Sequence, residues 1–118
     1  RFTSYIGAKT IEKYGIKAQF KFPNDILING KKIAGILAES VFIGNEIKGV
    51  IVGIGINLNL NKEEVKNIDI PATSIFIETG NNIDKSEFLE KLLHNFKKEY
   101  DEFLKNGMNE EARGLLKV

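Results

Sequence analysis

The sequence predicts an α+β domain, and two features carry that prediction. Two hairpin signals, Asn29-Gly30 and Gly44-Asn45, each separate runs rich in isoleucine and valine in the middle of the chain. Segments with the apolar spacing of a helix lie on either side of them, at residues 1–15 and 84–105. At 118 residues and 42% hydrophobic content, the chain has enough apolar side chains for one core. We therefore expect an antiparallel meander of three strands, part of a larger mixed sheet, with both helices packed on one face.

Local signals define the first helix and the first hairpin. Phe2, Ile6 and Ile11 form a rough apolar stripe, and Gly15 marks the end of the helix. Asn29-Gly30 then forms a two-residue loop between apolar runs, which is the strongest short-range indication of a hairpin with a type I′ turn. The loop fixes the register of the two strands that it joins.

In that register Leu27 lies opposite Lys32, and Asp25 lies opposite Ala34. Because side chains alternate between the two faces of a strand, these four residues share one face. The opposite face carries Ile26, Ile28 and Ile33. Asp25 and Lys32 are then diagonal neighbours. By themselves they predict either a cross-strand ion pair on a solvated face or part of a binding site.

The second hairpin extends the same face. With Gly44-Asn45 as its loop and no bulge, Lys32 lies opposite Asn57. Lys32 is then flanked by Asn57 on one side and, diagonally, by Asp25 on the other. Their neighbours on this face have almost no side chain: Ala34, Gly53 and Gly55. The other face carries a continuous apolar surface that helices must cover, made of Ile33, Leu37, Val50, Val52, Ile54 and Ile56.

Small residues around a lysine, an aspartate and an asparagine would let a flat or bulky ligand lie directly on the sheet. The alternative is that the glycines mark bulges, which would shift the register by one residue and exchange the two faces. The residues alone leave both interpretations open.

The last predicted helix begins at Asp84, an N-cap with Glu87 as its capping-box partner, and ends at Asn106-Gly107. His94, the only histidine, lies on its polar side and is expected at the surface. The preceding residues 59–67 are polar and predict a loop or short turn. The apolar stripe of the helix has the spacing of a core-facing surface and consists of Leu89, Leu92, Leu93, Phe96, Tyr100 and Leu104.

Three short motifs follow one another along the chain: residues 21–25 (Lys-Phe-Pro-Asn-Asp), 32–39 (Lys-Ile-Ala-Gly-Ile-Leu-Ala-Glu) and 53–57 (Gly-Ile-Gly-Ile-Asn). In order, spacing and chemistry they resemble the catalytic domain of biotin protein ligases. Phe22 stands where the familiar form of the first motif has Trp. Residues 71–75 and the helix after them are also similar to that family, so the resemblance covers nearly the whole chain. It implies a class II synthetase-like fold.

The resemblance implies a reaction in two steps: biotin and ATP give biotinyl-5′-adenylate and pyrophosphate, and biotin then passes to a lysine of a biotin carboxyl carrier protein. Where the anionic carboxylate meets the α-phosphate a fixed cation is needed, and Lys32 is the candidate catalytic residue. Asp25 is expected to hold Mg²⁺ on the phosphates or to orient Lys32. The residues expected to bind biotin are Lys32, Gly35, Ile36, Gly53 and Gly55. Those expected to bind ATP are Lys21, Asn24, Asp25 and Asn57.

Two parts of that family have no counterpart in residues 1–118: the Gly- and Arg-rich loop that wraps the adenylate, and a small SH3-like domain. The resemblance therefore implies a partial catalytic domain that is inactive by itself. Its truncated sheet is expected to expose an edge that pairs with a second copy. Two alternatives stay open: a lipoate ligase or acyltransferase relative, and a non-catalytic module that only binds ligand or a partner.

Composition narrows the expected partners. A net charge of +1, with lysine and glutamate mixed throughout, argues against a nucleic-acid-binding surface. The absence of cysteine excludes disulfides, thiolate catalysis and cysteine metal sites, and fits a cytoplasmic location. No apolar run approaches the ~18 residues needed to span a bilayer, and no signal-peptide pattern opens the chain. The expected partners are biotin, ATP and a carrier domain, without nucleic acid or membrane.

Overall fold

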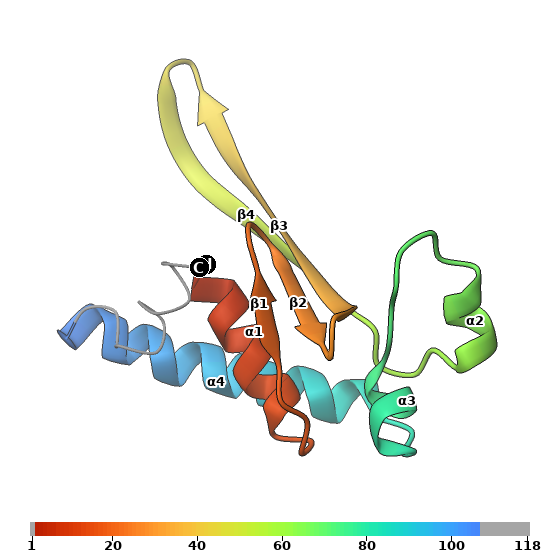
Figure 1. Ribbon diagram of the computed structural model, residues 1–118. Coiled ribbons are helices and arrows are strands. Elements are labelled where there is room, and N and C mark those ends of the chain that lie inside the picture. Colours follow the sequence, from red (N-terminus) through yellow and green to blue (C-terminus); the bar gives the residue numbers. More distant parts are fainter. Residues whose placement is uncertain (1, 107–118) are drawn as a thin grey trace.

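The computed structural model describes residues 2–106, in which one sheet lies beside a group of helices (Figure 1). The sheet is antiparallel and has four strands in the order β1-β2-β3-β4. The predicted α+β class is therefore confirmed. One strand, β1, is additional to the prediction, because its three residues are too few for an alternating pattern to be recognised. The elements are α1 (Phe2–Glu12), β1 (Gln19–Lys21), β2 (Asp25–Ile28), β3 (Lys31–Ile43), β4 (Glu46–Ile56), α2 (Lys62–Lys66), α3 (Ile75–Thr79) and α4 (Lys85–Asn106).

The hydrophobic core lies between the helices and the base of the sheet. Ile26 and Ile28 of β2 and Ile33 of β3 are buried there, together with Ile11 of α1 and Phe88 of α4. Removing each such side chain from water stabilises the fold by about 1.5–3 kcal/mol, before the entropy of ordering it is subtracted. The predicted helix cover is confirmed for α1, which packs on the base of the sheet, and the opposite face is left open for a site.

Helix α4 packs along α1 rather than directly on the sheet (Figure 1). The buried Asn95 side-chain amide of α4 donates a hydrogen bond of 3.0 Å to the Thr10 hydroxyl of α1. The prediction that the whole apolar stripe of α4 faces a core is wrong, since Leu93 is 59% and Leu104 63% exposed. Because α4 rests on α1, only its first half reaches the common core, and a cavity of about 430 Å³ remains among α1, α4 and β4.

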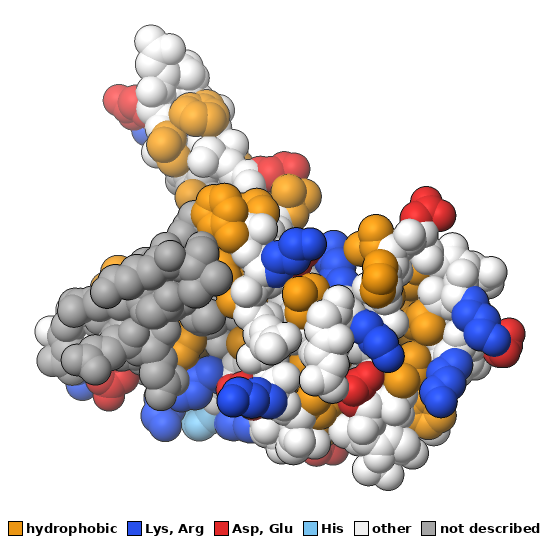
Figure 2. All heavy atoms as spheres, in the orientation of Figure 1, with side chains coloured by type: hydrophobic (Ala, Val, Ile, Leu, Met, Phe, Trp, Pro, Cys, Tyr) orange, Lys and Arg blue, Asp and Glu red, His pale blue; other side chains and the backbone are white. Residues whose placement is uncertain are grey.

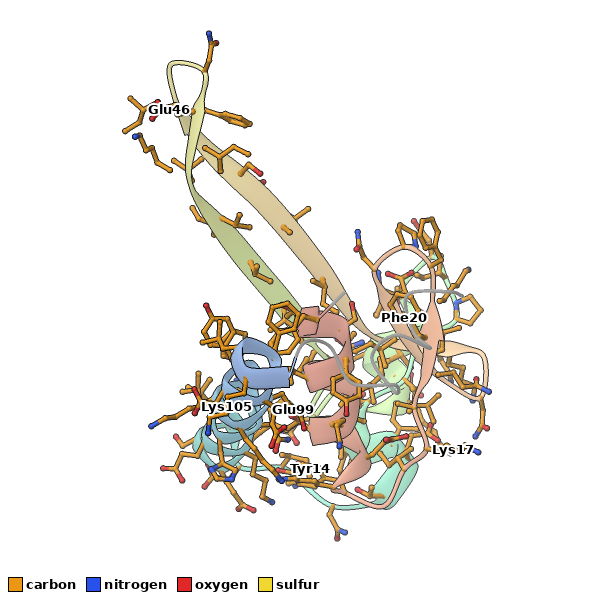
Figure 3. All side chains as sticks on the ribbon, turned by 90° about the vertical axis from the view of Figure 1, so that its left-hand side faces the viewer. Tyr14, Lys17, Phe20, Glu46, Glu99 and Lys105 are labelled. Atoms are coloured by element: carbon orange, nitrogen blue, oxygen red, sulfur yellow. The ribbon has the colours of Figure 1, made fainter. Side chains whose placement is uncertain are left out.

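The far half of the β3–β4 hairpin extends beyond the helices into solvent (Figure 2). Val50 and Val52, predicted to lie under helices, are 60% and 45% exposed. Figure 3 shows side chains that project from both faces of this hairpin, as far as Glu46 near its tip. The strands have 13 and 11 residues, whereas α1 is an 11-residue helix with a shorter rise per residue, so it covers only the base of the sheet.

A β-bulge next to Lys32 changes the predicted faces of β3. The pairing of Lys32 is as predicted, but Ile26 pairs with Ala34 instead of Ile33. Ile33 is therefore an extra residue, and the strand exchanges its faces beyond it. Ala34, predicted on the ligand face, is buried on the helix side, and Gly35 occupies the ligand face in its place.

A second bulge lies near the other end of the sheet. Gly44-Asn45 forms the predicted loop, but the pairing shifts by one residue beside it because Lys48 of β4 is extra. From there to the base, each β3–β4 pair is one residue away from the prediction. Gly35 consequently lies opposite Gly55, and Leu37, predicted in the core, is 62% exposed on the ligand face.

The first turn has the predicted geometry. Asn29 and Gly30 have φ angles of 50° and 80°, and a type I′ turn needs positive φ at both positions. Asparagine and glycine tolerate that region best, so the turn is determined locally. The turn holds Lys32 at the start of β3.

The remaining predictions about the helical part are mostly confirmed. The Asp84 carboxylate accepts hydrogen bonds from the backbone N–H groups of Ser86 and Glu87 and so caps α4. His94 is exposed, and Gly107 lies outside the described residues. The polar segment after β4 contains the short helix α2. No helix within residues 2–106 is long and apolar enough to cross a membrane.

Candidate functional site

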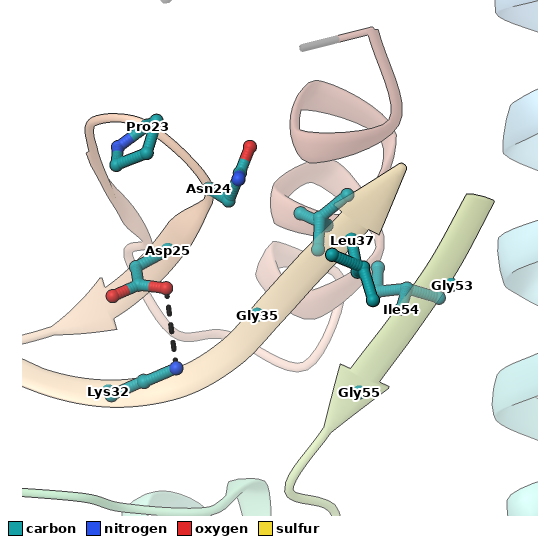
Figure 4. Close-up of a pocket in the computed structure, with 10 residues that line it drawn as sticks. Pro23, Asn24, Asp25, Lys32, Gly35, Leu37, Gly53, Ile54 and Gly55 are labelled. Carbon is teal, nitrogen blue, oxygen red and sulfur yellow. Dashed lines mark ion pairs between the residues drawn. The ribbon is translucent and has the colours of Figure 1, made fainter. Parts of the chain in front are cut away.

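A cavity of about 600 Å³ opens over the base of β2, β3 and β4, on the face away from the helices (Figure 4). It brings together parts of the three sequence motifs, at residues 21–25, 32–39 and 53–57. Its lining consists of Pro23, Asn24, Asp25, Lys32, Gly35, Ile36, Leu37, Gly53, Ile54 and Gly55.

Lys32 and Asp25 form an ion pair inside this cavity. The Lys32 Nζ lies 3.3 Å from Asp25 Oδ1, and the two side chains are 35% and 32% exposed. The predicted diagonal contact is therefore confirmed. A pair this accessible to water adds little to fold stability, since solvent screens its attraction. Its importance is its position: among the residues that the structure describes, Lys32 is the only lysine or arginine in the cavity lining.

Gly35 lies directly beneath the ion pair. A Cβ atom built on Gly35 would stand 3.2 Å from both Cε and Nζ of Lys32 and 3.8 Å from Asp25 Oδ1. The first two distances are closer than ordinary van der Waals contact, so a side chain here would push the lysine aside. A Cβ on Gly53 would meet only the Leu37 carbonyl, at 3.8 Å, and one on Gly55 would meet nothing within 4 Å. The floor of the cavity is bare backbone.

Leu37 forms an apolar wall of the cavity, and the sequence analysis missed it. The prediction had placed its side chain in the core, because the bulge at Ile33 leaves no mark in the apolar pattern. Ile36, predicted to bind biotin, has its side chain buried on the helix side, so its backbone is the part that reaches the cavity.

Lys21 and Asn57, both predicted to bind ATP, are outside the lining of this cavity. Lys21 is exposed at the end of β1, opposite Asp25 in the ladder. The Asn57 side-chain amide donates a hydrogen bond of 3.1 Å to the Thr73 carbonyl, and Asn57 lines a neighbouring cavity of about 510 Å³. The predicted pairing of Lys32 with Asn57 is wrong, because the described ladder between β3 and β4 ends at Ala34.

Residues 71–73 occupy the place beside Lys32 that the prediction gave to β4. The Lys32 backbone N–H donates to the Pro71 carbonyl at 2.9 Å, and the Thr73 N–H donates to the Lys32 carbonyl at 2.9 Å. Together they form a parallel bridge centred on Ala72. The backbone of Lys32 is therefore held from both sides, by β2 and by this segment.

Asp25 is the candidate ligand for Mg²⁺. Within residues 2–106 it is the only carboxylate in the cavity lining, and these residues contain no group of three or more His, Cys, Asp or Glu side chains that could hold a metal. Mg²⁺ is commonly bound by one or two carboxylates together with substrate phosphates. The donor set thus suits a metal ion that arrives with a nucleotide.

Comparison with known proteins shows which family the chain resembles. Residues 2–57 match the model of the biotin/lipoate A/B protein ligase family. The chain is 40% identical over 100 residues to the bifunctional ligase/repressor BirA of Bacillus subtilis, and 45% identical over 74 residues to the biotin–[acetyl-CoA-carboxylase] ligase of Paracoccus denitrificans. These alignments cover 81% and 61% of this chain, and 30% and 31% of the relatives, so the chain spans about a third of their length.

Among solved structures, the biotin protein ligase from Aquifex aeolicus in complex with biotin and ATP is similar, with a TM-score of 0.70 and 28% sequence identity. The similarity covers 89% of this chain and 43% of that one. The fold, the order of the motifs and the sequence matches all agree, and the chain belongs to the biotin/lipoate A/B protein ligase family.

Proposed function

We propose that this chain is the part of an ATP-dependent biotin ligase that activates biotin. The biotin carboxylate attacks the α-phosphorus of ATP and the bond to pyrophosphate breaks, which gives biotinyl-5′-adenylate. A lysine amine of a biotin carboxyl carrier protein then attacks the acyl carbon, and AMP leaves. The observation that carries the proposal is the Lys32–Asp25 pair above a floor of bare backbone. The names of the relatives support biotin and ATP as substrates.

Lys32 has the central role in this proposal. Both reactants are anionic, and further negative charge builds on the phosphoryl oxygens in the transition state. The Nζ of Lys32 can donate to a carboxylate oxygen and a phosphate oxygen at once. Because it is held by the ion pair and by its backbone bridge, little reorganisation is needed. Removing one well-placed donor of this kind typically lowers the rate by ~10²–10³-fold.

Asp25 carries a negative charge, opposite to that of Lys32, and therefore has a different role. A carboxylate in direct contact with phosphate would repel it, so we assign Asp25 to orienting Lys32 and to holding Mg²⁺ when the nucleotide brings that ion. When bound, Mg²⁺ would neutralise phosphate charge. Asn24, next to Asp25 in the lining, offers neutral hydrogen bonds to the nucleotide.

The glycine floor suits the ring system of biotin. Gly35, Gly53 and Gly55 leave open backbone on which a compact bicyclic ring can lie, and Leu37 supplies an apolar wall beside it. Ile36 contributes its backbone. Lys21 and Asn57 would contact the nucleotide where it extends beyond this cavity. Lys21 lies on the β1 side, and Asn57 lies in the neighbouring cavity.

The alternative substrate class is lipoate, which the family description also covers. Pyrophosphate exchange into ATP separates the two classes, and it should be measured on the intact protein, meaning the natural polypeptide that contains this sequence. We expect exchange that depends on biotin and is absent with lipoate. Exchange with lipoate alone would identify a lipoate ligase, and binding of biotin without any exchange would identify a non-catalytic module.

We also propose that two copies pair through the free edge of β4. Within the described residues β4 is one of the two outer strands of the sheet, with β1 at the other edge, and unpaired strand edges tend to add another strand. Its large apolar side chains are exposed, among them Ile47, Val50, Ile51 and Val52.

Sedimentation velocity tests this pairing. Ile51→Lys should convert a dimer to a monomer, because a charge at the edge opposes pairing. Leu93→Lys is the matched control, since Leu93 is similarly exposed but lies on α4. A protein that is monomeric at every concentration, or a dimer that both substitutions disrupt equally, would contradict the proposal.

A further inference from the structure

Residues 71–78 form a clamp around the segment that carries Lys32. Two backbone hydrogen bonds join Lys32 to this clamp, from its N–H to Pro71 and from Thr73 to its carbonyl, each 2.9 Å long. No strand of the sheet supplies these bonds, because the β3–β4 ladder ends at Ala34. The position of Lys32 therefore depends on a segment that lies about forty residues further along the chain.

The clamp is itself fixed by side chains. Thr73 is fully buried, and its hydroxyl donates a short hydrogen bond to the carboxylate of Glu78 on α3. Ser74, also fully buried, caps α3 by accepting from the Ile77 N–H, and it donates to the Leu60 carbonyl at 2.6 Å. Each bond restrains a different part of the segment. Of these two residues, Thr73 is the one whose backbone is also hydrogen-bonded to Lys32.

We propose that Thr73 and Glu78 are positioning residues for Lys32. The proposal rests on the proposed function, in which Lys32 is the cation of the adenylation step. The hydroxyl–carboxylate bond fixes the side chain of Thr73, and this orients its backbone N–H toward the Lys32 carbonyl. Displacement of that carbonyl moves the Cα from which the whole lysine side chain extends. A misplacement of about 1 Å at a reacting group can cost ~10²-fold in rate.

The ordinary role of such a bond is to support the fold, and the chain offers a matched control for that role. Thr10 is likewise a fully buried threonine whose hydroxyl is hydrogen-bonded, donating to the Ile6 carbonyl at 2.8 Å and accepting from Asn95. It lies on α1, away from the cavity lining. Valine has nearly the shape of threonine, so Thr10→Val and Thr73→Val each remove one buried hydroxyl and little else. Only the second should affect Lys32.

Backbone hydrogen exchange in the intact protein tests the clamp without reference to activity. Thr73→Val should accelerate exchange of the Lys32 amide by at least about tenfold, through a local opening that the lost bond makes easier. Thr73→Ser keeps the hydroxyl and should restore protection, and Thr10→Val should leave the Lys32 amide unchanged. Glu78→Gln, which keeps a weaker acceptor, should fall between Thr73→Ser and Thr73→Val. Equal effects of Thr73→Val and Thr10→Val on this amide would overturn the proposal.

A double-mutant cycle in the adenylation rate tests the positioning role. Thr73→Val should lower kcat by about 10- to 100-fold with little change in KM for biotin. In a Lys32→Ala background it should have no further effect, because the group that it positions is gone. Additive losses would show a structural role only and overturn the proposal. If Lys32→Ala alone left the rate intact, the proposed function would fail, while the exchange measurement would still decide whether the clamp exists.

Discussion

Gly35 of β3 lies directly opposite Gly55 of β4, and this pair forms the bare sheet beside Lys32. Neither glycine has a positive φ, so the backbone at both positions could carry any residue without strain. What the glycines provide is the absence of a side chain. Where two strands both lack a Cβ, a ligand can lie against the peptide planes within reach of the lysine.

Gly55→Val is expected to abolish biotin and ATP binding while the protein stays folded. Valine suits a strand, and a Cβ at this position meets no atom within 4 Å, so the side chain fills the cavity rather than the core. Calorimetric titration of the intact protein measures the binding. Gly49→Val is the control, because it is on the same strand with equally open space and outside the cavity. Undiminished binding by the Gly55 variant would show that ligands lie elsewhere.

Gly35→Ala is expected to slow adenylate formation by up to about tenfold, because the new methyl group would stand 3.2 Å from the Lys32 Nζ and shift it by a few tenths of an ångström. The free energy of unfolding should change by less than about 0.5 kcal/mol, as for other accessible positions. Gly49→Ala is the control and should leave the rate unchanged, since its Cβ meets no atom within 4 Å and Gly49 lies outside the cavity lining. If the two variants had equal rates, Lys32 would not be held against Gly35.

The bulge at Ile33 predicts opposite results for two adjacent residues. Ile36→Ala should lower the free energy of unfolding by about 2–5 kcal/mol, because that side chain is buried in the core. Leu37→Ala should cost less than about 0.5 kcal/mol and weaken biotin binding instead, since Leu37 is 62% exposed in the cavity wall. Urea unfolding followed by circular dichroism separates the two. The reverse order of stabilities would mean that β3 has the register without a bulge.

The sequence predicts the local features of this fold but not the faces of β3. Local chemistry determines the Asn29-Gly30 turn, the hairpins and the contact of Asp25 with Lys32, and all of these are confirmed. The bulges depend on long-range packing that no local pattern records, so the faces of Ala34 and Leu37 were exchanged in the prediction.

Two further features lay beyond the sequence for similar reasons. The exposure of the α4 stripe follows from α4 resting on α1, which its own periodicity cannot reveal. The bridge from residues 71–73 to Lys32 joins segments far apart in the chain. The family resemblance includes Pro71 to Ile75, but the sequence does not show that this segment contacts the candidate catalytic residue.

The 118-residue chain by itself is expected to bind ATP weakly and to form no biotinyl-5′-adenylate. In the described part of the chain, Lys32 is the only cation in the lining of a cavity that is open to water. In a water-like dielectric a single contact between lysine and phosphate at ~4 Å is worth only about 1 kcal/mol. Pyrophosphate release by the purified chain measures this, with the intact protein as the positive control. Release at the rate of the intact protein would show that one cation suffices.

The central claim is that Lys32 is the cation on which adenylate formation depends, and the rate of biotin-dependent pyrophosphate exchange by a Lys32→Ala variant of the intact protein tests it most directly. Lys31→Ala is the matched control, because Lys31 is the adjacent exposed lysine and is outside the cavity lining. We predict a loss of at least ~10²-fold for Lys32→Ala, with an unchanged circular dichroism spectrum and no loss for the control. A folded Lys32→Ala variant that exchanges as fast as Lys31→Ala would contradict the account.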